Sequence, residues 1–398
     1  MASKSSTSFD LSLLVSKLEN GSYPIFAYSN RLGKSCPASL PQAVVSGLEK
    51  TAQQLRLNPL PMPALQDFGR QLFEALIHDQ VRDMFRTLEG QNGAGFNVHL
   101  VLDLQPQSLQ RLPWECMWDP YLGRFISLQG NTHLIRKLQK PQGCAAPQAS
   151  PGYSNLVIAI ANPHKKPPLN PQRERDLIDL AVGELHQGGL LNRHFIQGSQ
   201  NEMRAALSAV PDIFHFVGHG GLNDADVPGL YLEDTSADYV FVTAAELENE
   251  YFTPPPGVDR RVHLVILSAC QTSETPLTEG YSSLAHRLLS QVDTVLAMQY
   301  PIGLDNLTDF NTGLYHALAN GVPLETAVSA ARRKIITDRP GGLRDWIAPV
   351  LVTRQDASAN LLQLVSKNPF KGPLHYDAPD REWFFGRETE LSRLSDLY

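Results

Sequence analysis

The stretch Asp212–Gly221 reads DIFHFVGHGG and combines the pattern of a buried strand with a histidine flanked by glycines at its end. Residues Ile213–Val217 are apolar apart from His215, which is typical of a strand covered on both faces. Its last part places His219 between glycines, where the backbone is free to turn sharply and approach another molecule closely. A titratable ring at the end of a buried strand makes His219 a candidate for chemistry.

Similar apolar runs recur along the second half of the chain, at residues 155–161, 262–269 and 293–298. Segments with apolar residues at helical spacing separate them, for example 171–189, where Leu177, Leu180, Ala181 and Leu185 recur. Strands buried on both faces and separated by helices favour a mostly parallel sheet with helices covering it. The expected fold class is therefore α/β.

Segments rich in proline, glycine and small residues divide the chain into parts. We expect an N-terminal half at 1–140, a linker at 141–154, a second half at 155–366, and a further linker leading into another module at 367–398. Within the first half, residues 68–90 have a strongly helical pattern, and 95–104 and 124–129 resemble strands. The first half is thus also a mixture of helices and strands.

Composition excludes several classes of protein. The formal net charge is −7, and the 34 lysines and arginines are scattered, so a nucleic-acid partner is not expected. The N-terminus lacks the apolar core of a signal peptide, and no uninterrupted apolar stretch is long enough to span a membrane. We therefore expect a cytoplasmic protein that has no membrane partner.

The four cysteines are Cys36, Cys116, Cys144 and Cys270, too few for a disulfide scaffold in 398 residues. They show no CxxC or Cys/His spacing, so no metal or other cofactor is expected. Cys116 lies in the apolar stretch LPWECMWDP and is expected to be packed rather than reactive. His215 alternates with Ile213 and Val217, which indicates a hydrogen-bonded core residue.

Cys270 is the thiol with a candidate partner. In an open parallel sheet, the carboxyl ends of the strands meet at one edge, where reactive crevices form. His219 follows the strand expected at 212–217 and Cys270 follows the strand expected at 262–269, so both are expected at that edge. A nearby imidazole promotes thiolate formation, and the amides of Gly220 and Cys270 could face a developing oxyanion. The alternative to a catalytic role is that Cys270 is a small hydrophobic residue buried in the core.

The segments DIFHFVGHG and VILSACQT resemble the paired motifs of the CHAT peptidases, bacterial relatives of caspases and separase. His219 and Cys270 are 51 positions apart, close to the interval of about 50 residues noted for caspases. Further landmarks follow the family's order, including FGRQLFEALI, RLPWECMWDP, HLIRKL, VLAMQYPI and WIAPVLVT, so the resemblance runs from Phe68 to Thr353. It implies a caspase-like sheet whose catalytic half is 155–366, with 1–140 as the non-catalytic half.

The same resemblance implies a cysteine endopeptidase with a protein substrate. Cys270 would be the nucleophile, His219 the general acid and base, and the Gly220 amide an oxyanion donor. The resemblance implies no third residue that would extend this dyad to a triad. Ser268 stands where caspases carry a glutamine that helps to hold an aspartate before the cut, so we assign it to the substrate pocket but do not carry over the aspartate preference. Neither Asp224, Asp226 nor Glu233 can be assigned to that pocket from the sequence.

The C-terminal stretch Glu382–Tyr398 resembles the FxGRExEL opening of STAND-type signal-transducing ATPases. No GxxxxGK[ST] phosphate loop occurs, so ATP hydrolysis by these residues is disfavoured. The resemblance implies an effector in a bacterial anti-phage or signalling system. This effector would be attached to an NTPase and sensor region and activated by assembly, with an oligomer as one form of that assembly. Such activation would order the polar segments 223–227 and 273–279.

A second function remains open at this level. A caspase-like fold that keeps its motifs can also serve as a catalytically silent binding or oligomerisation module. The sequence does not choose the preferred cleavage site, the substrate protein, the activating signal or the oligomeric state.

Overall fold

The computed structural model describes residues 8–91, 96–138, 154–187, 191–234, 238–271, 280–338 and 344–354. The side chains of 154, 184, 185, 187, 270, 271 and 280–283 lie outside this description. Contacts divide the chain into Met1–Leu364 and Val365–Tyr398, and every described residue belongs to the first unit. None of the described helices has the length and apolar character of a membrane span.

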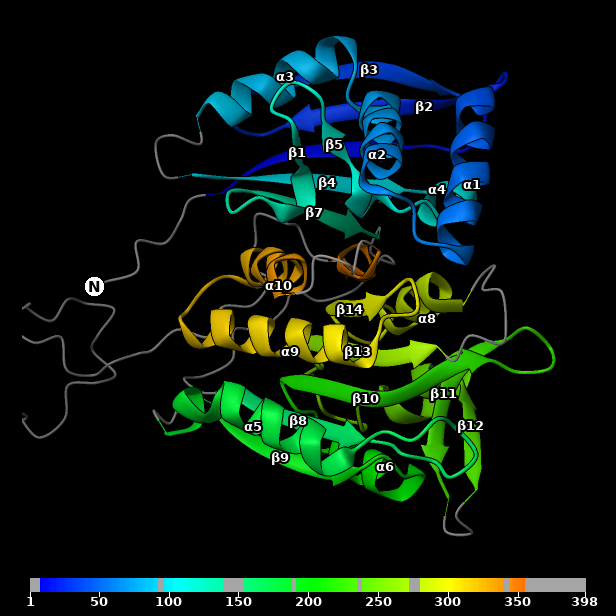
Figure 1. Ribbon diagram of the computed structural model, residues 1–398, viewed down its shortest axis with the longest axis vertical. Coiled ribbons are helices and arrows are strands. Elements are labelled where there is room, and N and C mark those ends of the chain that lie inside the picture. The colour runs from blue at the N-terminus through cyan, green and yellow to red at the C-terminus, as the bar shows by residue number, and fades with distance from the viewer. Residues whose placement is uncertain are drawn as a thin grey trace, which may run out of the picture. The chain divides into compact units, whose positions relative to one another are not determined.

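Among the described residues, one mostly parallel sheet of 13 strands runs through both halves of the chain (Figure 1). Its strands are β1 (Ser8–Val15), β2 (Ser22–Ser29), β3 (Lys34–Pro41), β4 (Asn97–Leu104), β7 (Thr132–Lys137), β8 (Ser154–Ile160), β9 (Leu191–Gln197), β10 (Ile213–Leu222), β11 (Pro228–Glu233), β12 (Tyr239–Thr243), β13 (Leu264–Gln271), β14 (Thr294–Met298) and β15 (Pro349–Thr353). The order is β12-β11-β10-β13-β14-β15-β7-β4-β1-β2-β3, with β8 beside β10 and β9 beside β8. A separate two-stranded sheet pairs β5 (Trp118–Asp119) with β6 (Arg124–Phe125).

Helices cover the sheet and connect its strands. They are α1 (Gln42–Leu57), α2 (Met62–Leu76), α3 (Asp79–Gly90), α4 (Gln107–Gln110), α5 (Pro171–Gln187), α6 (Gln200–Ser208), α7 (Ala244–Glu246), α8 (Gly280–Leu288), α9 (Leu304–Ala319) and α10 (Leu324–Asp338). Single turns of other helix types occur at Trp114–Cys116, Leu247–Tyr251, Ile126–Leu128 and Asp345–Ile347. The expected α/β class with a mostly parallel sheet is confirmed.

In the second half, the two faces of the sheet are covered by different helices. Ile213, Val217 and Ile266 face the side packed by α5 and α9, which lie in front of the strands in Figure 1. Phe214 and Leu267 belong to a second cluster, which contains apolar residues of α6 and α8. Because both faces are buried, these strands are apolar almost throughout.

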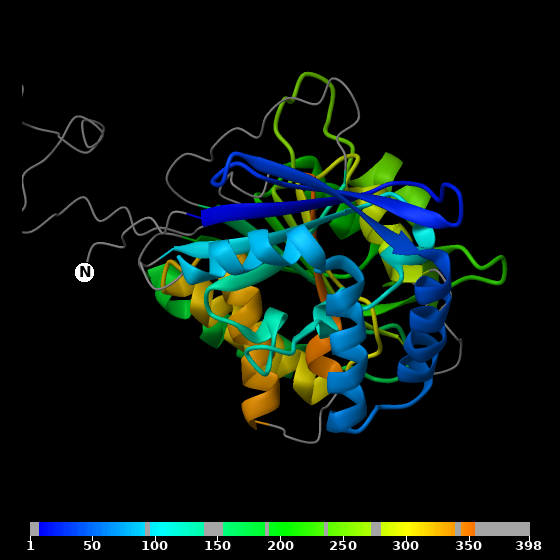
Figure 2. The same ribbon diagram turned by 90° about the horizontal axis from the view of Figure 1, so that it is seen from above.

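The first half differs from the sequence expectation in three places. The helix expected at 68–90 is two helices, because Asp79 has a φ of +45°, a left-handed conformation that cannot continue a right-handed helix. The strand expected at 124–129 is only the two-residue β6, followed by a single helical turn. The strands β1–β3 were not predicted; viewed from above, α1–α3 lie on one side of them (Figure 2).

The buried face of α5 also differs from the predicted one. Leu180, expected on the apolar face, is 78% exposed, whereas Ile178 and Val182 are buried. Glu174, Ile178 and Val182 are spaced four residues apart, so they form one stripe on the helix. The packing of α5 against the sheet and α9 selects this stripe, which is less apolar in sequence than the alternative.

The two halves are joined through the sheet and through a buried polar cluster. Strand β15 of the second half pairs in parallel with β7 of the first half. On β7, Arg136 donates to both carboxylate oxygens of the fully buried Glu115, at 3.0 and 2.5 Å. Gln299, which follows β14, donates to the same carboxylate at 2.8 Å. Glu115 and Arg136 come from the stretches RLPWECMWDP and HLIRKL, which therefore build the joint between the halves.

Candidate active site

His219 and Cys270 lie side by side in the backbone of the sheet. Strands β10 and β13 are parallel neighbours, and their register pairs His219 with Cys270. Paired residues on adjacent strands have backbones roughly 4.8 Å apart. Positions 217 and 219 on β10, and 268 and 270 on β13, are two residues apart, so each pair belongs to one face of the alternation. The side chain of Cys270 lies outside the described residues.

Both residues belong to strands rather than to the loops after them, which corrects the sequence expectation. The strand predicted to end at Val217 continues to Leu222, and β13 continues to Gln271. The extension of β10 has a partner that the sequence did not reveal, because His219–Leu222 pair with Tyr231–Pro228 of the antiparallel β11. Gly218, Gly220 and Gly221 therefore lie within a ladder.

The imidazole of His219 is buried and is oriented by a main-chain carbonyl. His219 is only 3% exposed, and its Nε2 lies 2.8 Å from the carbonyl oxygen of Pro167. A carbonyl only accepts hydrogen bonds, so Nε2 carries a proton. In the neutral ring the basic lone pair is then on Nδ1. This bond selects the tautomer and fixes the plane of the ring.

Pro167 is a candidate site residue that sequence reasoning missed. Its contribution is a backbone oxygen, a group that every residue carries, so its residue type gives no signal. The segment KKPPL, residues 165–169, follows the first strand of the second half and thus lies at the same edge as His219. Loops at that edge were candidates in general, but the register of β8 against β10 was needed to bring this one to His219.

Behind the pair lies a buried chain of hydrogen bonds. The hydroxyl of Tyr315 donates to Nδ1 of His215 at 2.9 Å, and Nε2 of His215 donates to the hydroxyl of Ser268 at 2.8 Å. Ser268 in turn donates to Oδ1 of Asn311 at 3.0 Å. Every proton in this chain has a place when His215 is neutral. Burial lowers the pKa of His215 to about 3, which keeps it neutral at physiological pH.

This network confirms the prediction that His215 is a hydrogen-bonded core residue. It ties β10, β13 and α9 together immediately before the positions of His219 and Cys270. The hydroxyl of Ser268 is used within the network, and the residue is fully buried. Its assignment to a substrate pocket stays a prediction, and contact with a substrate would require this hydroxyl to become accessible.

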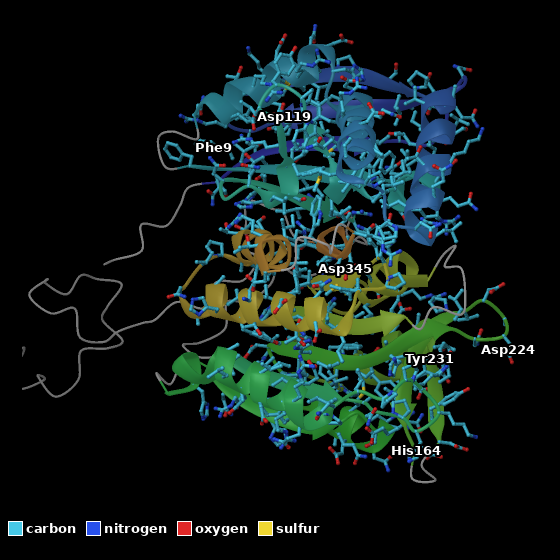
Figure 3. The ribbon with its side chains drawn as sticks, viewed as in Figure 1. Phe9, Asp119, His164, Asp224, Tyr231 and Asp345 are labelled. Atoms are coloured by element: carbon cyan, nitrogen blue, oxygen red, sulfur yellow. The ribbon has the colours of Figure 1, made fainter. Side chains whose placement is uncertain are left out.

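The remaining predicted positions are placed as follows. Gly220 lies between Leu230 of β11 and Gln271 of β13, and its role as an oxyanion donor stays a prediction. The segment 223–227 joins β10 to β11, with Asp224 on it (Figure 3). The side chain of Asn223 accepts from the amides of Ala225 and Val227 and holds this turn. The segment 273–279 lies outside the described residues.

The other thiols that the structure describes are not suited to nucleophilic chemistry. Cys116 is fully buried, as predicted, with its Sγ 3.6 Å from the carbonyl oxygen of Leu65. Burial raises the pKa of both Cys36 and Cys116, so their reactive thiolate forms are disfavoured. Cys144 lies outside the described residues. No group of three or more His, Cys, Asp or Glu residues in the described part of the chain is arranged to hold a metal ion.

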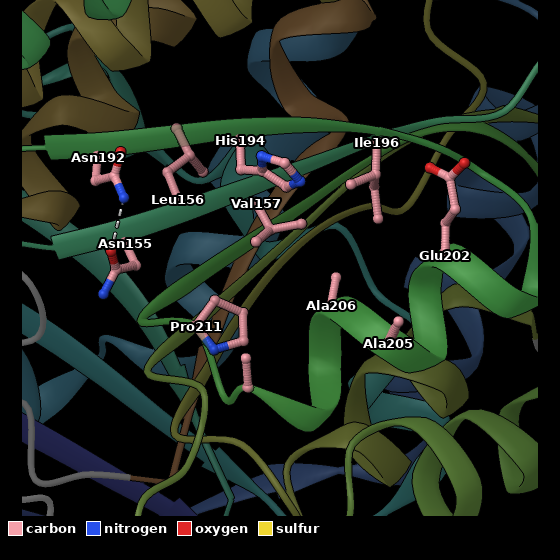
Figure 4. Close-up of a pocket in the computed structure, with 11 residues that line it drawn as sticks. Asn155, Leu156, Val157, Asn192, His194, Ile196, Glu202, Ala205, Ala206 and Pro211 are labelled. Atoms are coloured by element: carbon pink, nitrogen blue, oxygen red, sulfur yellow. Dashed lines mark hydrogen bonds between the residues drawn. The ribbon is translucent and has the colours of Figure 1, made fainter.

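An open groove of about 640 Å³ lies elsewhere, between β8, β9 and α6 (Figure 4). Its lining is mainly apolar and includes Val157, Ile196 and Ala206, with Asn155 and Asn192 near the amino ends of the two strands. His219 and Pro167 do not line it. The groove is therefore separate from the candidate active site.

Comparison with known protein families identifies the family of this chain. The family model described as CHAT domain matches residues 66–354, which includes both strands of the His219–Cys270 pair. The chain belongs to the CHAT domain family.

The matched CHAT region contains β4 and every later described strand of the sheet and begins after α1, so β1–β3 lie before it. No curated protein matches the chain. Among solved structures, it is similar to the crystal structure of the Arg-specific cysteine proteinase gingipain R (RGPB), at 10% sequence identity and a TM-score of 0.41. That similarity covers 78% of this chain and 73% of the gingipain chain.

Proposed function

We propose that this CHAT domain is a cysteine endopeptidase in which Cys270 and His219 cleave a peptide bond in a partner protein. The observation that carries the proposal is the register of β10 against β13, which pairs these two positions in a member of the CHAT family. The bond from His219 to Pro167 supports it, because a base must be oriented by a third group to act efficiently.

The chemistry follows from the tautomer of His219. With the Nε2 proton held by Pro167, Nδ1 accepts the proton of the Cys270 thiol, and the thiolate attacks the scissile carbonyl. The negative oxygen of the tetrahedral intermediate is stabilised by backbone amides, for which Gly220 and Cys270 are the candidates. The Nδ1 proton then passes to the leaving amine. A water molecule, deprotonated by Nδ1, releases the acyl group and restores the thiol.

The wider role is also a proposal. The resemblance of Glu382–Tyr398 to the start of a STAND NTPase supports an effector that an attached sensor activates by assembly in the cytoplasm. The segment 223–227 already forms a turn that Asn223 holds, so activation is not needed to order it; that activation orders 273–279 stays a prediction. An anti-phage function would fit such an activated protease.

The test uses a peptide library read by mass spectrometry, with the chain alone and with the full-length protein in its activated state. Cleavage by the wild type should fall to background in Cys270→Ala and in His219→Gln. Cys144→Ala is the matched control, because it removes a thiol outside both motifs, and its cleavage should equal that of the wild type. Unchanged cleavage or unchanged biological output in folded Cys270→Ala would refute the protease and favour the silent binding module.

A further inference from the structure

Two consecutive residues of one loop contact two rings that lie opposite each other in the sheet. His219 of β10 pairs with Tyr231 of β11, and side chains directly opposite in an antiparallel pair lie on the same face. The ammonium of Lys166 lies 3.7 Å from the centre of the Tyr231 ring. The next residue, Pro167, accepts the hydrogen bond from His219. The dipeptide therefore spans the cross-strand pair.

The ring of Tyr231 is a rigid support for this contact. Its edge lies against Gly221, where an added Cβ would approach the ring to 3.0 Å. Phe241 packs against it edge to face, with ring centres 4.9 Å apart. The hydroxyl donates to the carbonyl of Leu222 at 3.3 Å. Figure 3 shows Tyr231 on the strand beside β10, so the ring is held by the hairpin that extends the His219 strand.

The loop also has a fixed base at residues 162–169. The amide of Asn162 donates to the carboxylate of Glu233 at 2.6 Å, which anchors the start of the loop to β11. The side-chain oxygen of Asn162 accepts from the amide of Leu169 at 2.8 Å and closes the loop. Between these points the amide of Lys166 donates to the carbonyl of Pro163 at 3.1 Å. Lys166 then reaches the ring of Tyr231 from the middle of a closed loop.

We propose that Lys166 and Tyr231 are positioning residues that hold the Pro167 carbonyl against Nε2 of His219. This inference rests on the proposed function, since it explains how the base keeps its working tautomer. The residue Pro167 is exposed, so water can compete for its carbonyl and for the imidazole proton. A cation over an aromatic face favours the closed loop over the open one by roughly three- to thirtyfold. Without the contact between Lys166 and Tyr231, the imidazole of His219 loses its fixed tautomer and orientation.

The experiment observes the imidazole directly. Nitrogen NMR of the chain with ¹⁵N-labelled histidine reports the tautomer of His219, assigned by its loss in His219→Gln. In the wild type Nε2 should carry the proton, and its exchange with water should be slow. Lys166→Met should populate the other tautomer and speed exchange by roughly three- to thirtyfold, in proportion to the lost contact. Lys166→Arg keeps a cation over the ring and should restore both signals.

Matched controls separate this effect from loss of charge or of fold. Lys165→Met removes the neighbouring cation, which pairs with Asp238 at 3.0 Å on the surface, and should leave His219 unchanged. His215 is an internal reporter of the fold, because its buried bonds to Tyr315 and Ser268 should persist in every variant. An unaltered His219 tautomer and exchange rate in Lys166→Met would overturn the inference.

Activity provides the second readout. In the cleavage assay, Lys166→Met should lower kcat by roughly three- to thirtyfold and alter the acidic limb of the pH profile, with rescue by Lys166→Arg. If Cys270→Ala retains cleavage while Lys166→Met alters the tautomer, the protease proposal fails and the positioning role stands. If cleavage depends on Cys270 but Lys166→Met matches the wild type in kcat and tautomer, the positioning role fails alone.

Discussion

Replacing His99 with glutamine should remove a pH-dependent contribution to the stability of the joint between β4 and α10. His99 is 2% exposed, and its ring lies between Asp10 of β1, at 3.2 Å, and Glu325 of α10, at 3.4 Å. Burial opposes the charge on this ring, but the two carboxylates outweigh it and raise the pKa of His99 to about 9. His133 of β7, with its ring centre 6.0 Å away, has a pKa well below its ordinary value because it is buried and faces the His99 charge, so it stays neutral.

The magnitude follows from the two pKa values. Raising the pKa from 6.5 in the unfolded chain to about 9 in the folded one corresponds to roughly 3.4 kcal/mol. The folded state holds a proton that the unfolded state releases. The stabilisation is therefore complete below a pH of about 6.5 and is lost as the pH rises through about 9. Between pH 7 and pH 8.5 the contribution should fall by roughly 1.7 kcal/mol.

Urea unfolding of the wild type and His99→Gln, at half-unit steps from pH 7 to pH 9.5, measures this change. The difference in unfolding free energy between the two proteins should shrink with rising pH by the amount given above. His316→Gln, at an exposed position of α9, is the control and should follow the wild type at every pH. Parallel curves for wild type and His99→Gln across this range would refute a protonated His99 between the carboxylates.

Two further substitutions test the buried polar groups. Arg136→Met leaves the carboxylate of Glu115 buried without its bidentate partner and should lower the unfolding free energy by about 3–5 kcal/mol, measured by urea titration. The double variant Arg136→Met with Glu115→Leu removes that buried carboxylate and should recover most of the loss. Ser268→Ala removes the acceptor of the His215 Nε2 proton and should cost about 1–3 kcal/mol, measured by thermal unfolding; no loss would contradict the hydrogen-bond chain. An altered residue preference before the cut in the same variant would support its pocket assignment.

The sequence by itself predicted four strands of the second half, β8, β10, β13 and β14, and the two positions around which the candidate site is built, whereas β9, β11, β12 and β15 were not predicted. Apolar runs such as 155–161 and 262–269 report burial on both faces, a property written in consecutive residues. The neighbourhood of His219 and Cys270 could be expected because parallel strands bring their carboxyl ends to one edge. The motifs also pointed to the CHAT family, which the match over 66–354 bears out.

Local pattern was a poor guide where packing chose between alternatives. On α5 the apolar stripe of the sequence contains Leu180, yet the helix buries Ile178 and Val182 because those residues meet the sheet and α9. The strands β1–β3 were not recognised: β3 carries prolines at 37 and 41, and strand propensity depends strongly on neighbouring strands.

Only the tertiary structure decided the register that pairs His219 with Cys270, the extension of β10 by β11, and the carbonyl that orients the imidazole. Each of these depends on contacts between segments that are far apart in the chain. A main-chain oxygen or a strand register has no residue type of its own, so it leaves no mark in the sequence. The packing of the 162–169 loop against the β10–β11 hairpin brings this carbonyl to the imidazole of His219 in the candidate site.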